Sequence, residues 1–145
     1  MAKRAVFACS DPREFCLDAW AHAKGEFPDD KICPVFNFGS ICDVVRYPGN
    51  LSEHPTIRFM VEHGIEMASA YNHENCSRYQ SLIEGLDRFQ ELGFHITELN
   101  IFVKRVRAEA IPAFQAELYY QELDAAKEKV AVTHHVEEDS KAIAA

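Results

Sequence analysis

The chain contains no long apolar run, and no stretch approaches the ~20 apolar residues that a membrane-spanning helix needs. Its basic start, Met1 to Arg4, is followed only by the apolar run 5–9, which is too short for the apolar region of a secretory signal peptide. These two absences predict a cytoplasmic protein without a membrane partner.

Basic residues are also scarce. Lys and Arg number 15 against 23 Asp and Glu, which gives a formal net charge of −8. A surface of this sign repels phosphate groups, so the sequence argues against nucleic acid and against an anionic membrane as partners.

The five cysteines lack a regular spacing, and no two of them form a Cys-x-x-Cys pair. They are Cys9, Cys16, Cys33, Cys42 and Cys76. An odd number of this kind is typical of a reducing compartment, with thiols or metal ligands rather than a disulfide framework. The missing Cys-x-x-Cys pair argues against a thiol-based redox function. We interpret Cys16, Cys33 and Cys42 as small buried apolar residues.

A length of 145 residues suits one domain with a substantial core. We assign this domain to residues 1–130, because residues 131–145 are polar and alanine-rich and are expected to form a flexible C-terminal tail. No internal repeat or low-complexity block interrupts the domain.

Short apolar runs alternate with helical patterns along the chain. Strands are expected at residues 5–8, 32–38, 65–71 and 99–106, and helices at 11–25, 40–45, 57–64, 79–93 and 112–129. The apolar stripe of the fourth helix, with Leu82 and Leu86, is expected in the core. Pro34 predicts an edge position for the second strand, because proline cannot donate to a ladder. The alternation predicts an α/β fold with a parallel sheet of strand order 2-1-3-4 and helices on both faces.

Two cysteine-bearing motifs follow apolar runs that are far apart in the sequence. Cys9 follows the first expected strand, and His73 and Cys76 follow the third. The carboxyl ends of adjacent parallel strands meet at one edge of a sheet, which is where open α/β sheets bind ligands. A helical turn would place His73 and Cys76 on one face. Two thiolates and one imidazole form a zinc site with an open fourth position, which is typical of a catalytic zinc ion.

Asp11 and Arg13 stand directly beside the first of these motifs. We expect Arg13 to pair with the Asp11 carboxylate and keep it ionised, so that it can orient a water molecule on the metal or occupy the open position itself. Asp11 also suits the N-cap of the following helix, with Pro12 at the first helical position, and the two functions are compatible.

The pattern Cys-x-Asp-x-Arg followed by His-x-x-Cys resembles the zinc signature of the β-class carbonic anhydrases. Between the two, Asn37-Phe38-Gly39-Ser40 is similar to the Asn-Ala-Gly-Asn segment of that family. The resemblance implies zinc on Cys9, His73 and Cys76, an Asp11–Arg13 catalytic dyad, and a substrate pocket near Asn37 and Gly39. It also implies a homodimer or higher homo-oligomer and the reversible hydration of carbon dioxide by zinc-bound hydroxide.

Two positions depart from the family pattern. Phe36 stands where the family has an arginine or lysine, and Ser77 replaces a glycine. Three alternatives therefore stay open for the small-molecule chemistry. In the first, the chain hydrates carbon dioxide. In the second, it hydrolyses a related molecule such as carbonyl sulfide or carbon disulfide. In the third, it binds zinc or a partner without catalysis.

Overall fold

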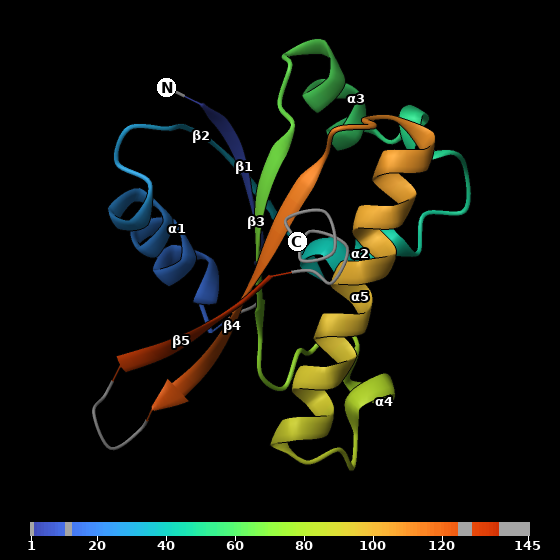
Figure 1. Ribbon diagram of the computed structural model, residues 1–145. Helices are drawn as coiled ribbons and strands as arrows, with labels where there is room; N and C mark the ends of the chain where they lie inside the picture. Colours follow the sequence, from blue (N-terminus) through green and yellow to red (C-terminus); the bar gives the residue numbers. More distant parts are fainter. Residues whose placement is uncertain (1, 11–12, 125–128, 137–145) are drawn as a thin grey trace.

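A five-stranded sheet forms the centre of the protein (Figure 1). The computed structural model describes residues 2–10, 13–124 and 129–136. The strands are β1 (Lys3–Cys9), β2 (Lys31–Asn37), β3 (Met67–His73), β4 (Gln115–Asp124) and β5 (Lys129–Val136). The helices are α1 (Phe15–Glu26), α2 (Ser40–Val45), α3 (Pro55–Glu62), α4 (Gln80–Ile83) and α5 (Arg88–Glu109), with a 3₁₀ turn, η1 (Leu51–Glu53). The chain is therefore an α/β protein.

The sheet has the order β2-β1-β3-β4-β5, in which β1 to β4 are parallel and β5 runs antiparallel to β4. The expected place of the first strand between the second and the third is confirmed, since Ala5 pairs with Cys33 on one side and with Ala68 on the other. The edge position of β2, predicted from Pro34, is also confirmed.

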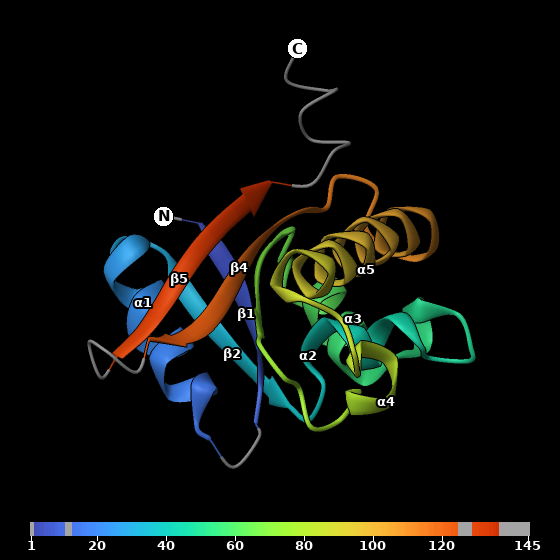
Figure 2. The same cartoon turned by 90° about the horizontal axis from the view of Figure 1, so that it is seen from below.

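Helices cover both faces of the sheet. Helix α1 lies on one face, and α2, α3 and α5 lie on the other (Figures 1 and 2). Successive side chains of a strand point to opposite faces, so in β1 Phe7 joins the core under α2, α3 and α5, and Val6 joins the smaller core under α1. Strand β1 is buried on both faces, as expected of a central parallel strand.

The prediction of a strand at residues 99–106 is wrong, because this segment lies in α5. Leu99, Phe102, Val103 and Val106 are fully buried and recur at helical spacing. The fourth strand of the sheet is instead β4, within the segment predicted as helix 112–129. Its buried Ala116, Leu118 and Tyr120 alternate along the strand. The predicted all-parallel sheet of four strands is thus corrected to a mixed sheet of five.

The helix predicted at 79–93 is in fact two helices. Asp87 and Gln90 form a capping box that begins α5, and Gly85, at φ 83°, separates it from α4. Because α4 stops at Ile83, the expected buried stripe is formed only in part: Tyr79 and Ile83 are buried, whereas Leu82 is 47% and Leu86 37% exposed.

Two boundaries also differ from the prediction. Helix α1 begins at Phe15 after Glu14, which has a left-handed φ of 62°, and it continues past Gly25; Asp11 and Pro12 lie outside the described residues. The domain continues past residue 130, since β5 pairs with β4 as far as Val136, and residues 137–145 lie outside the described part. No helix in the described ranges is long and apolar enough to cross a membrane.

A substitution at Phe102 tests the assignment of residues 99–106 to α5. It is fully buried, and its ring lies edge-on to Phe7 and Phe114 with centroids 5.4 Å away in each case. We expect Phe102→Ala to lower the free energy of unfolding by about 3–5 kcal/mol, because it leaves a cavity. The measurement is urea unfolding. Ile101→Ala is the control, since Ile101 is 41% exposed on the same helix and should change stability by about 0.5 kcal/mol or less. Equal losses for both variants would contradict the assigned helix face.

Candidate metal site

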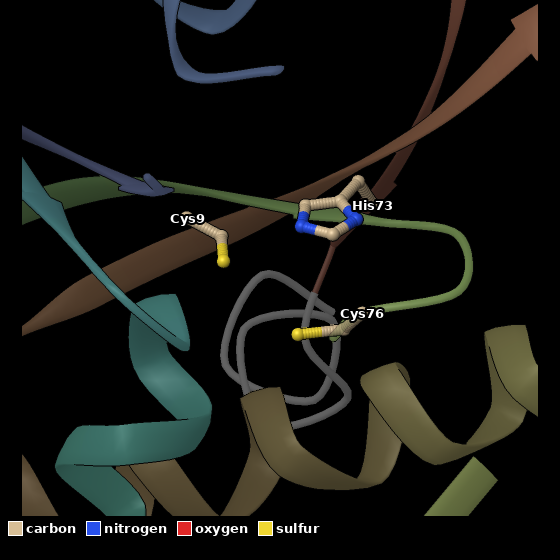
Figure 3. A group of neighbouring side chains, drawn as sticks. All are labelled: Cys9, His73 and Cys76. Carbon is tan, nitrogen blue, oxygen red and sulfur yellow. The ribbon is translucent and has the colours of Figure 1, made fainter. Parts of the chain in front are cut away.

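Three side chains converge where two adjacent strands end. Cys9 is the last residue of β1, His73 is the last residue of β3, and Cys76 follows in the next turn. One potential ligand atom from each lies within 4.8 Å of the other two, and all three residues are buried. Figure 3 shows the imidazole and the two sulfurs facing one another. This group can hold a metal ion.

The segment between His73 and Cys76 is a tight turn, not the helical turn considered from the sequence. Asn75 at its tip has a left-handed φ of 51°. Asparagine adopts this conformation more readily than most residues. The turn reverses the chain after β3 and so brings Cys76 close to His73.

The imidazole of His73 is oriented by its surroundings. Its Nδ1 lies 2.8 Å from the carbonyl oxygen of Glu74, which only accepts, and 3.4 Å from Nη2 of Arg13, which only donates. The shorter contact indicates that Nδ1 carries the hydrogen, so that Nε2 is the nitrogen with a lone pair for a metal. The ring also stacks on Phe15, with centroids 4.6 Å apart.

Hydrogen-bond donors surround the two sulfurs. The N–H of Gly39 donates to Cys9 Sγ over 3.2 Å. Gly39 has a φ of 109°, and a Cβ there would lie 2.9 Å from the Tyr79 ring, so no other residue fits. Hydrogen bonds from Cys9, His73 and the Tyr79 backbone lower the pKa of Cys76 well below that of an ordinary thiol. The Cys76 sulfur is therefore suited to the thiolate form that binds metals.

The turn that carries Cys76 is held from two sides at Asn75. Its N–H donates to Oε1 of Glu91 over 2.6 Å, and its carbonyl accepts from Nη2 of Arg13. Glu91 belongs to α5 and is only 6% exposed. Burial raises the pKa of Glu91, and the hydrogen bond from Asn75 opposes that rise. Helix α5 thereby fixes the turn between two of the three potential ligands.

Of the two residues expected to act in catalysis, the structure describes one. Arg13 lies beside the metal group, where it contacts Asn75 and His73. Asp11 lies outside the described residues, so the Asp11–Arg13 dyad stays a prediction.

A small cavity adjoins the three potential ligands, with a volume of about 10 Å³. Gly39 lines it, as the expectation of a pocket near this residue requires, but Asn37 does not. Asn37 instead donates from Nδ2 to the carbonyl of Ser40, 3.1 Å away, and so shapes the turn that places Gly39. Within the described residues, which include all five cysteines, no disulfide is formed, and Cys42 also lines the cavity.

Several residues at this cavity were not predicted. Asn72 donates from Nδ2 to Nδ1 of His95 over 3.0 Å, and burial lowers the pKa of His95 to about 3, so its ring is neutral. Tyr79 lines the cavity and is held by its hydroxyl, which donates to Asp43 Oδ1 over 3.0 Å. The sequence carries a signal only for Asn72, which directly precedes His73; Glu91 and His95 resemble ordinary helix residues.

Comparison with known proteins adds no identification: no protein-family model matches the chain, and no curated protein matches it. The arrangement of Cys9, His73 and Cys76 is therefore the feature on which a functional proposal depends.

The thiolate form of Cys76 can be tested in the metal-free protein. Because the pKa is lowered in the folded state, the thiolate persists at pH 6 and is lost only as the pH falls through the folded pKa. We expect thiolate absorbance near 240 nm at pH 6, which Cys76→Ser removes and Cys33→Ser leaves. Burial raises the pKa of Cys33, which makes it a matched control. An unchanged absorbance in Cys76→Ser would contradict this assignment.

A substitution at Glu91 tests whether this residue supports the turn that carries Cys76. We expect Glu91→Leu, which removes the acceptor for Asn75 N–H, to weaken metal binding about 10–100-fold. Glu91→Gln keeps an acceptor and should weaken it less. The measurement is competition with a chromophoric chelator, and Co²⁺ absorption reports the ligand geometry. The control is Glu98→Gln. Glu98 belongs to the same helix and is also buried, but its carboxylate binds Arg46. Wild-type affinity in Glu91→Leu would contradict the role of Glu91.

Proposed function

We propose that the chain binds Zn²⁺ through Cys9, His73 and Cys76 and catalyses the reversible hydration of carbon dioxide, as β-class carbonic anhydrases do. The observation that carries this proposal is the convergence of two cysteines and one histidine within 4.8 Å at the ends of two neighbouring parallel strands. A catalytic zinc ion commonly has three protein ligands, so that one coordination position remains for water or substrate.

The donor set suits zinc. Thiolate sulfur and imidazole nitrogen are the ligands that select zinc over magnesium or calcium, which prefer oxygen. The N–H of Gly39 beside Cys9 and the carbonyl of Glu74 beside His73 supply the supporting contacts that metal ligands usually have. A zinc ion held there would supply Lewis-acid activation of water.

The chain's own residues supply the remaining requirements of such a reaction. Tyr79, Ile83 and Phe94 form an apolar wall of the adjoining cavity, which suits a small neutral substrate and limits the access of bulk water. Arg13 and Glu91 hold the turn of Cys76, so the ligands need little rearrangement to bind the metal. The proposed role of Asp11 is to accept a hydrogen bond from the reacting water.

The sequence motifs support the same proposal independently. Cys-x-Asp-x-Arg and His-x-x-Cys occur in the order that the β-class carbonic anhydrases have, and the strands that precede them, β1 and β3, are neighbours. The hydrolysis of carbonyl sulfide or carbon disulfide would use the same ligands and the same cavity. The homodimer that the resemblance implies stays a prediction.

One observation favours zinc binding without catalysis as the second candidate. Phe36, which stands where the family has a basic residue, is 38% exposed and lies edge-on to Trp20, with centroids 6.3 Å apart. It does not line the cavity. The cationic side chain that the family places there has no counterpart at this position, so the site would bind the metal but lack part of the reaction machinery.

Metal analysis tests the first half of the proposal. We expect one zinc ion per chain in the purified wild-type protein, and a loss of most of it in Cys9→Ser and Cys76→Ser, because a hydroxyl is a far weaker zinc ligand than a thiolate. Cys33→Ser should retain the zinc, since Cys33 lies in β2 away from the group. Undiminished zinc in both ligand variants would refute the site.

Stopped-flow carbon dioxide hydration tests the second half. We expect zinc-loaded protein to accelerate hydration above the buffer rate, and Cys76→Ser to abolish the acceleration. One zinc per chain with no acceleration would refute the hydratase and favour either zinc binding alone or hydrolysis of carbonyl sulfide, which a hydrogen sulfide assay detects.

A further inference from the structure

A second cavity lies at the end of the sheet opposite to the metal group. Its volume is about 180 Å³, and it lies between the second half of α1, the segment that follows, and the start of β2. Ile32 at this cavity pairs with Arg4, and the Cys9 end of β1 is about 16 Å further along the strand. The cavity is therefore a separate site. Its lining residues are Trp20, Lys24, Phe27, Pro28, Asp30 and Ile32.

Most of the wall of this cavity is apolar. Phe27 and Ile32 pack on the core under α1, and Trp20 lies edge-on to Phe36 with centroids 6.3 Å apart. These contacts support the wall, while Trp20, Phe27 and Ile32 stay only half-buried. An apolar cavity of about 150 Å³ accepts benzene. A cavity of about 180 Å³ therefore has room for one six-membered ring with a small substituent.

The charges at the cavity leave one cation without a partner. Asp30 Oδ2 accepts from Arg4 Nε over 3.0 Å, and the two side chains are largely buried, so their charges balance. Arg4 is also held by Phe27, because its guanidinium lies 3.6 Å from the ring centroid. Lys24 Nζ lies over the Trp20 ring, 5.1 Å from its centroid, and no carboxylate of the described residues pairs with it. The cavity thus offers one positive charge beside an aromatic wall.

This combination selects the chemistry of a ligand. A flat apolar ring would displace water from the half-buried Trp20 and Phe27 rings, which is favourable. One carboxylate on the ring would supply the counter-charge that Lys24 lacks. A cationic ligand would meet the charge of Lys24, and a second negative charge would find Asp30 and no further free cation among the lining residues.

We propose that this cavity binds a small aromatic monocarboxylate, with its ring against Trp20 and Phe27 and its carboxylate on Lys24. The site shares no residue with the metal group or the cavity beside it. The proposal is therefore independent of the proposed function and can be tested on metal-free protein.

Benzoate is the probe, and the fluorescence of Trp20 is the readout, because Trp20 is the only tryptophan of the chain. We expect a saturable change on titration of the metal-free protein with benzoate. The neutral benzyl alcohol should bind about fivefold more weakly, which is the worth of about one surface ion pair, and the cationic benzylamine should bind more weakly still. No saturable change with benzoate would overturn the site. Equal or tighter binding of benzyl alcohol or benzylamine would overturn the assignment of a carboxylate.

Lys24→Gln separates the charge from the apolar wall. We expect it to weaken benzoate binding about fivefold and to leave benzyl alcohol binding unchanged, because only the ion pair is lost. Lys104→Gln is the control, since Lys104 is exposed on α5 and should keep the wild-type affinity. Unchanged benzoate affinity in Lys24→Gln would overturn the role of Lys24. Zinc content should be the same in Lys24→Gln and the wild type, so a failure here leaves the proposed function standing.

Discussion

The parallel pairing of β1 with β3 is the constraint on which the site depends. Ala8 of β1 pairs with Tyr71 of β3, so Cys9 and His73 leave the sheet at the same edge although 64 positions separate them in the numbering. A slip of one residue in this register would turn every side chain of a strand to the opposite face. Because β1 packs on helices at both faces, such a slip would bury the wrong side chains, and the core thereby maintains the geometry of the metal group.

The turn that follows β3 is the second element of the site, and α5 controls it. Asn75 occupies a left-handed conformation between two potential ligands, where its N–H is held by Glu91 and its carbonyl by Arg13. Turns that are tied on both sides lose little entropy when a ligand binds. Holding the turn in this way requires a buried carboxylate at Glu91, and this burial raises the pKa of Glu91.

The second half of the chain shows why a local sequence pattern does not by itself distinguish a strand from a helix. Residues 99–106 are apolar enough to suggest a strand, yet Leu99, Phe102, Val103 and Val106 form the buried stripe of a 22-residue helix. Residues 115–124 contain good helix formers, yet they form β4, because the free edge of β3 can pair with them and the alternating Ala116, Leu118 and Tyr120 then become buried. In both segments tertiary burial overrides local propensity.

The amino-acid sequence by itself determined the α/β class, the adjacency of the first three strands, and the three potential metal ligands. These features depend on short apolar runs and on the residues directly after them, which are local. Only the tertiary structure decided that β5 extends the sheet, that α5 replaces a strand, and that Glu91, His95 and Ser40 lie at the site. Those residues act through contacts with segments far away in the chain, and no local pattern records which distant side chain a buried carboxylate or imidazole will face.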